Sequence, residues 1–162
     1  MEGREQVYDY LGRMGIEYQV SEHPAVFTVE AMEELGLDRI GAIVKNLFLR
    51  DGKGRRHFLV MIRQDKKVDL KELQALIGVS GLRFASPERL EKYLGLEKGA
   101  VSPFGLLNDQ DKAVEVVVDL DLQDGRPLGV HPNDNTATVW LSFEDLGRVI
   151  EHCGNPAAQM KV

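Results

Sequence analysis

The residue best suited to chemistry in this sequence is Lys45, which lies inside an apolar run from Ala42 to Leu49. Such a run predicts a largely buried β-strand. Because side chains alternate along a strand, Lys45 is expected to share a face with Ile43, Leu47 and Leu49. A buried ammonium without a partner is costly, so this lysine needs a carboxylate, a set of carbonyls or the oxygen atoms of a ligand. The alternative is an amine that reaches solvent at the strand end.

Two loops are candidates to face this lysine. The segment 99–109 is long, apolar and irregular, and backbone N–H groups near Gly105 could bind a carbonyl or hydroxyl oxygen. The segment 129–138 contains His131, held extended by Pro132, which could donate to a substrate or transfer a proton. The alternatives are an ordinary packed loop and a structural histidine.

Several common catalytic motifs are absent from the sequence. Its four histidines and single cysteine, Cys153, show no metal-ligand spacing, and we expect neither a metal nor a cofactor. There is no phosphate-binding loop, dinucleotide fingerprint or serine nucleophile elbow. Cys153 falls near the end of an expected helix and is interpreted as a packing residue.

The elements that must position these residues alternate between strands and single helices. Helical spacing and capping residues predict helices over 3–13, from Thr28 to Gly36, from Asp69 to Gly78, from Ser86 onward and from Ser142 to Gly154. Strands are expected at 16–20, 42–49, 57–62, 82–85, 114–119 and 136–141. The turn at 51–54 should join the second and third strands into an antiparallel hairpin.

This order is not the regular strand–helix repeat of a doubly wound parallel sheet. We expect one α+β domain over residues 1–162, with a mixed, mostly antiparallel sheet and helices packed outside it. The residues 155–162 are expected to form a loose tail.

Composition and charge set the outer bounds on function. The chain has 162 residues, of which 43% are hydrophobic and 28% charged, as in an ordinary soluble domain. No apolar stretch approaches the roughly 20 residues that span a bilayer. The single cysteine and the lack of a signal-peptide pattern favour a cytoplasmic setting. The net charge of −6 argues against non-specific coating of nucleic acid and against a DNA partner, although it permits local contact with RNA.

Four motifs, in this order, resemble the aminoacyl-tRNA editing family of YbaK and the prolyl-tRNA synthetase insertion domain. They are EHPAVFT at 22–28, VKNLFL at 44–49, PFGL at 103–106 and HPNDNTAT at 131–138. The resemblance covers essentially the whole chain and is closest to the free-standing PrdX (ProXp-ala) branch. It implies a partly barrel-like sheet and a deacylase that removes alanine in trans from tRNA for proline.

The resemblance also implies roles for individual residues. Lys45 matches the family's key catalytic lysine and Asn46 follows it, as in the family. Gly105 falls in the flexible glycine-containing loop near the ester, and His131 matches a late histidine of the aminoacyl pocket. An aminoacyl ester is already activated, so a positioned water and a stabilised oxyanion suffice without a protein nucleophile.

A synthetase site that accepts proline cannot strongly exclude a smaller amino acid, because a methylene alters the binding free energy by only ~1–3 kcal/mol. A second pocket, small enough for alanine and too small for proline, would make the opposite selection. Candidate walls of that pocket are Phe27, Val29, Met32, Ile43, Thr136 and Thr138. Candidate contacts to the tRNA acceptor end are Arg50, Arg83, Lys66 and Lys67, for which surface salt bridges are the alternative.

Three hypotheses follow. The first is an Ala-tRNA(Pro) deacylase, with the acceptor end of the tRNA as partner and prolyl-tRNA synthetase as a candidate second partner. Another is the same fold acting on a different misacylated tRNA, such as Cys-tRNA(Pro). The third is a non-catalytic module that binds aminoacyl-tRNA or a synthetase. Retention of Lys45 favours an enzyme.

Overall fold

The hairpin that carries Lys45 forms the centre of the sheet. In the computed structural model, which describes residues 3–162, β2 (Ala42–Arg50) pairs antiparallel with β3 (His57–Arg63). The Asp51 side chain fixes the turn between them by accepting hydrogen bonds from two backbone N–H groups, those of Arg55 and Arg56. This hairpin was predicted from the sequence and is confirmed.

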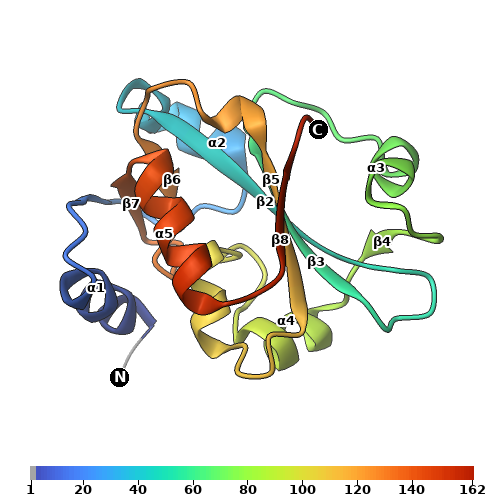
Figure 1. Ribbon diagram of the computed structural model, residues 1–162. Coiled ribbons are helices and arrows are strands. Elements are labelled where there is room, and N and C mark those ends of the chain that lie inside the picture. The colour runs from blue at the N-terminus through green and yellow to red at the C-terminus, as the bar shows by residue number, and fades with distance from the viewer. Residues whose placement is uncertain (1–2) are drawn as a thin grey trace.

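The remaining strands extend the sheet on both sides of this hairpin (Figure 1). They are β1 (Gln19–Glu22), β4 (Arg83–Phe84), β5 (Val114–Asp119), β6 (Leu128–Val130), β7 (Ala137–Leu141) and β8 (Ala157–Met160). The order is β1-β7-β6-β2-β3-β5-β8, and β4 also pairs with β2. Antiparallel pairs predominate, and parallel pairs join β2 to β6, β3 to β5 and β5 to β8. The sheet is therefore mixed, as expected, but it is open rather than closed into a barrel.

Helices begin at the capping residues that the sequence predicts. They are α1 (Gly3–Arg13), α2 (Val29–Glu34), α3 (Leu70–Ile77), α4 (Pro87–Leu94) and α5 (Phe143–Cys153). Four of them are capped by side-chain oxygens that accept hydrogen bonds from backbone N–H groups of the first turn; these oxygens belong to Thr28, Asp69, Ser86 and Ser142. Three short 3₁₀ turns complete the set: η1 (Leu37–Arg39), η2 (Pro103–Asn108) and η3 (Leu120–Leu122).

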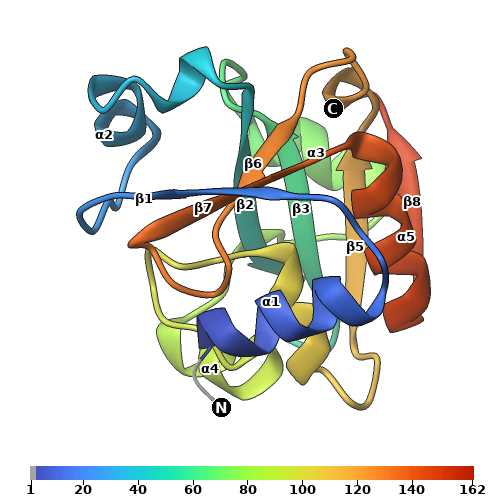
Figure 2. The same ribbon diagram turned by 90° about the vertical axis from the view of Figure 1, so that its left-hand side faces the viewer.

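The two faces of β2 belong to different apolar cores. Val44 and Phe48 pack into the large core, which includes residues of α1, α4, α5 and η2. On the other face, Leu47 contributes to the core beneath α3, and Ile43 to a smaller core that includes Met32 of α2. Figures 1 and 2 both show α2 and α4 at opposite ends of the molecule. Lys45, between Ile43 and Leu47 on that face, lies where these two smaller cores meet.

The expected loose tail is wrong. Residues 157–160 form β8, which pairs parallel with β5. Asn155 is buried at the start of this segment and donates hydrogen bonds to Asp109 and to the backbone oxygen of Val114, both at 2.8 Å. These contacts fix the segment although its side chains are largely exposed. The first strand also lies later than expected, at Gln19–Glu22 rather than 16–20.

Candidate active site

A cavity opens where β2 separates from its neighbours. The parallel pairing of β2 with β6 covers only Ala42 and Ile43, and its pairing with β4 begins only at Leu49. Among the described residues, the intervening edge of β2 therefore has no strand partner on that side. The cavity has a volume of about 390 Å³ and is lined by Phe27, Thr28, Val29, Glu30, Met32, Val44, Lys45, Asn46, Leu47, Gln64, Gly99, Val101, Gly129, Val130 and His131.

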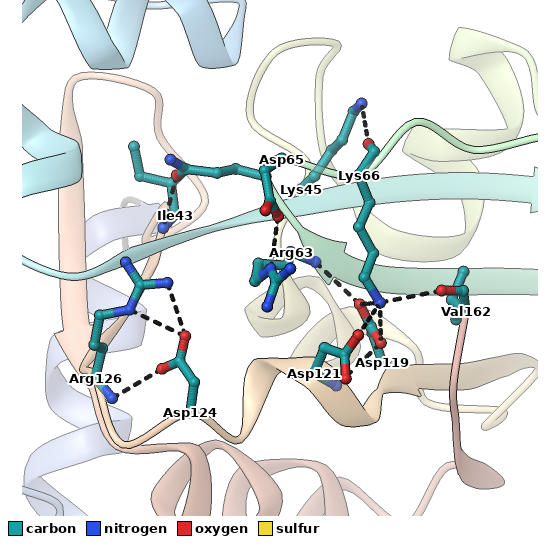
Figure 3. A network of polar contacts seen from close by, with 11 residues as sticks. Ile43, Lys45, Arg63, Asp65, Lys66, Asp119, Asp121, Asp124, Arg126 and Val162 are labelled. Atoms are coloured by element: carbon teal, nitrogen blue, oxygen red, sulfur yellow. Dashed lines mark hydrogen bonds and ion pairs between the residues drawn. The ribbon is translucent and has the colours of Figure 1, made fainter.

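Lys45 lines this cavity and is half-buried. Its Nζ donates to the backbone oxygen of Lys66 at 3.3 Å (Figure 3). An ammonium has three N–H donors, and this is the hydrogen bond that it makes within residues 3–162. The remaining donors are available to a ligand's oxygen atoms. The predicted burial on an apolar face is therefore present, with a carbonyl rather than a carboxylate as the partner.

Asn46 adds an unmatched acceptor beside the lysine. Its Nδ2 lies 3.5 Å from the Val44 backbone oxygen, while its Oδ1 is buried and has no hydrogen-bond partner among the described residues. Such a buried acceptor costs about 1–3 kcal/mol if it stays unpaired. Asn46 is also among the residues that line the cavity.

His131 contributes a neutral imidazole to the same cavity. Its Nδ1 lies 2.9 Å from the backbone oxygen of Ala137, and since a carbonyl only accepts, Nδ1 carries the proton. Nε2 therefore has a free lone pair. Burial lowers the pKa of His131, and the nearby His23, whose ring centroid is 6.1 Å away, lowers it further.

The predicted pocket walls divide into two groups. Phe27, Val29 and Met32 line the cavity, and Phe27 remains 71% exposed. Ile43, Thr136 and Thr138 are not among the residues that line it.

Each of these three residues has another structural role. Ile43 is 1% exposed and packs with Met32 in the small core. The Thr136 hydroxyl donates to Asp134 at 2.6 Å. Thr138 is fully buried, and its Oγ1 lies 2.8 Å from His23 Nε2. Thr138 therefore orients the histidine that neighbours His131 instead of contacting the cavity.

Gly105 is also misplaced by the sequence prediction. It lies in η2, and its N–H is already bonded to the backbone oxygen of Ser102. A Cβ at this position would lie 2.7 Å from Leu96 Cδ1 and 3.0 Å from Leu94 Cβ, so glycine is needed there for packing. The glycine that lines the cavity is Gly99, at the start of the same loop. Its φ of +91° and its contact with Phe27 require glycine.

The predicted tRNA contacts have different surroundings. Arg50 and Arg83 are paired positions on β2 and β4, about 16 Å along the strand from Lys45. Lys67 is exposed. Lys66 is only 16% exposed on its side chain and forms ion pairs with Asp119 and Asp121, both at 2.7 Å. The assignment of Lys66 as a phosphate contact is therefore corrected, because its ammonium group is already paired.

Two polar cavity residues were missed by the sequence interpretation. Glu30 is an exposed carboxylate on α2, and Gln64 accepts a hydrogen bond from the backbone N–H of Ile43 at 3.0 Å. Neither stands in a motif, and only the fold brings them to Lys45. Within residues 3–162, no group of three or more histidine, cysteine or acidic side chains could hold a metal. No helix among these residues has the length and apolar character needed to cross a membrane.

Comparison with known proteins places the sequence in one family. A family model described as the aminoacyl-tRNA editing domain matches residues 23–149. The chain is 51% identical over 155 residues to the prolyl-tRNA editing protein ProX of Acetoanaerobium sticklandii, covering 96% of this chain and 94% of that one. It is 38% identical over 150 residues to prolyl-tRNA synthetase associated domain-containing protein 1 of Danio rerio, covering 91% and 81%.

The fold is shared with a solved structure. A crystal structure of a protein assigned as a trans-editing enzyme for prolyl tRNA synthetase superposes with a TM-score of 0.74 at 24% identity. The match covers 100% of this chain and 98% of the other.

Proposed function

This chain belongs to the aminoacyl-tRNA editing domain family and is an aminoacyl-tRNA deacylase, and from that premise we propose that it acts in trans on tRNA for proline that carries alanine. The names of its relatives support tRNA for proline as the nucleic acid. The observation that carries the proposal is that Lys45, His131 and several apolar side chains line one cavity of about 390 Å³. The proposed setting is the cytoplasm, with prolyl-tRNA synthetase as a second partner.

Lys45 supplies the electrostatic part of the reaction. Water attacks the aminoacyl carbonyl carbon, the bond from this carbon to the ribose oxygen breaks, and free alanine and a ribose hydroxyl result. The negative charge that develops on the carbonyl oxygen is stabilised by the Lys45 ammonium, which has donors left after binding the Lys66 carbonyl. The protein needs no nucleophile of its own.

His131 orients the attacking water. Its Nδ1 proton is held by Ala137, so Nε2 accepts a hydrogen bond from the water. Because burial lowers the pKa of His131, the ring stays neutral and acts as a positioning acceptor. Asn46 follows Lys45 on β2 and also lines the cavity.

The apolar walls select the amino acid. Phe27, Val29 and Met32 surround the space next to Lys45, and α2 carries the latter two. The methyl group of alanine fits against these side chains, whereas the proline ring is larger and tied back to its nitrogen. A pocket that fits the methyl group would exclude the larger ring by steric clash, so sparing of the correctly charged tRNA would not depend on the ~1–3 kcal/mol that a missing methylene is worth.

Deacylation of a substrate panel tests this proposal. The panel is the same tRNA carrying alanine, cysteine, serine or proline, and the enzymes are wild type, Lys45→Ala and the control Lys53→Ala. Lys53 is exposed in the β2–β3 turn. We expect fast loss of alanine, sparing of proline, and a fall of about 10²-fold or more in Lys45→Ala only.

Each other outcome contradicts a defined part of the proposal. Equal hydrolysis of the prolyl ester rules out selection by the apolar walls. Preference for the cysteinyl ester assigns the chain to the alternative substrate. Wild-type rates in Lys45→Ala exclude the lysine mechanism. Binding of tRNA without cleavage of any ester would identify a non-catalytic module.

A further inference from the structure

A cluster of ionic groups lies directly behind Lys45. It consists of Lys66, Asp119 and Asp121 and is joined to Lys45 through the backbone oxygen of Lys66 (Figure 3). We propose that Lys66 and Asp119 are positioning residues, which hold the Lys45 ammonium at the ester by fixing the turn after β3. This inference rests on the proposed function, since it concerns the same lysine.

The turn is clamped at both of its ends. The side chain of Lys66 donates to Asp119 at 2.8 Å and to the backbone oxygen of Val162 at 3.0 Å. The other oxygen of Asp119 accepts from the backbone N–H of Arg63 at 3.3 Å. The backbone N–H of Lys66 donates to the Arg63 oxygen at 3.1 Å. A single carboxylate on β5 thus holds the beginning of the turn directly and its end through Lys66.

Burial makes this clamp stiff. The Asp119 side chain is fully buried and that of Lys66 is 16% exposed, so removing either charge strands the other in a poorly solvated place. Burial alone would lower the pKa of Lys66, but its hydrogen bonds with Asp119 and Asp121 outweigh that effect and raise it. The Lys66 ammonium therefore remains charged, and its side chain stays on the β5 side of the turn.

The same turn delivers two groups to the cavity. Its Lys66 carbonyl accepts from Lys45, and its Gln64 side chain lines the cavity while accepting from the Ile43 N–H. A shift of the turn would move both together. A displacement near 1 Å at a catalytic group costs up to about 10²-fold in rate, so a clamp on this turn matters for catalysis.

Kinetics of variants that remove a charge test the positioning role. In Asp119→Asn and Lys66→Gln we expect the single-turnover rate on alanyl-tRNA to fall about tenfold while KM stays within about twofold. Lys66→Arg keeps the charge and should recover most of the rate. The milder Asp121→Asn, at a partly exposed carboxylate, should show a smaller fall of the same kind.

The matched control is Glu115→Gln. It breaks the Arg56–Glu115 ion pair, which joins the start of β3 to β5 at the far end of the same strands. Its rate should equal that of wild type. A rise in KM without a fall in rate, or an equal fall in Glu115→Gln, would overturn the positioning role.

A second readout needs no tRNA and so separates this inference from the proposed function. Reductive methylation followed by mass spectrometry reports how readily the Lys45 amine reacts. Release from the Lys66 carbonyl should raise the initial methylation rate at Lys45 at least twofold in Asp119→Asn and Asp121→Asn, with no change in Glu115→Gln. Unchanged methylation in both aspartate variants refutes the inference even if Lys45 is catalytic. If methylation rises but alanyl-tRNA is not a substrate, the proposed function fails and the clamp on Lys45 stands.

Discussion

Lys45 places an ammonium group on an apolar face of β2. Its neighbours on that face, Ile43 and Leu47, belong to two separate cores, and the lysine occupies the gap between them. The Lys66 carbonyl accepts a hydrogen bond from the Lys45 amine, and Lys45 lines the cavity. In such partly dry surroundings, an ammonium stabilises developing negative charge more strongly than it would in water.

The neutral state of His131 predicts a particular pH dependence. Because burial lowers its pKa below the ordinary 6.5, the ring should keep its free Nε2 lone pair to a lower pH than an exposed histidine would. After subtraction of spontaneous hydrolysis, the single-turnover rate should therefore show an acid limb below pH 6.5. In His131→Gln the overall rate should be lower and that limb absent. A wild-type limb at or above pH 6.5 would contradict the neutral assignment.

The same shift has a consequence for stability. The unfolded chain takes up a proton at His131 at higher pH than the folded chain does, since the folded pKa is lower. The contribution of His131 is fully present above pH 6.5 and is lost as pH falls through the folded pKa. Urea unfolding at pH 7.5 and 5.5 should show a larger loss in wild type than in His131→Gln. An equal loss in both proteins would exclude this residue as the cause.

At the scale of elements, η2 is a packing element. Gly105→Ala should lower the free energy of unfolding by about 1–3 kcal/mol, because its Cβ would collide with Leu94 and Leu96. The rate per folded molecule should stay at the wild-type value. The control Gly147→Ala, on the exposed side of α5 with open space around it, should be neutral or stabilising. A wild-type free energy of unfolding together with lost activity would instead indicate that Gly105 acts in the active site.

Local signals predicted most of the helices and strands, and pairing between distant segments decided the rest. Capping residues such as Asp69 and Ser142 marked helix starts because the cap is formed within a few residues. β8 has the sequence AAQM, which lacks β-branched and aromatic residues, so nothing in it indicates a strand. β8 forms because this segment pairs with β5. The three-residue β6, with Gly129 at its centre, escaped prediction because it is too short to show an alternating pattern.

Of the candidate site, the sequence predicted which residues share a face of the strand that carries Lys45. The alternation of side chains along a strand placed Lys45 and Ile43 on one face. It could not show that Lys45 lines a cavity whereas Ile43 packs in a core. Likewise, the sequence left Lys66 open between a tRNA contact and a salt bridge, because its ion-pair partners lie more than 50 residues away at Asp119 and Asp121. Long-range packing determined each of these corrections.

At the scale of the whole molecule, an acidic protein must bind a polyanion locally. The net charge is −6, yet Arg50 and Arg83 occupy directly paired positions on one face, where like charges repel. A phosphate between them would offset that repulsion. Arg50→Gln and Arg83→Gln should each lower kcat/KM and reduce the salt slope by about 0.7 to 1. Arg13→Gln, on the α1 surface, is the control, and an unchanged slope in both test variants would remove these arginines from the tRNA path.

The most direct measurement is a crystal structure with a stable mimic of the substrate end, an adenosine whose ribose carries alanine through an amide bond. The account predicts that the amide carbonyl oxygen lies within hydrogen-bonding distance of Lys45 Nζ. The alanine methyl should contact Val29 or Met32, and the free amine should remain inside the cavity. A mimic bound with its carbonyl away from Lys45, or seated outside this cavity altogether, would contradict the central claim.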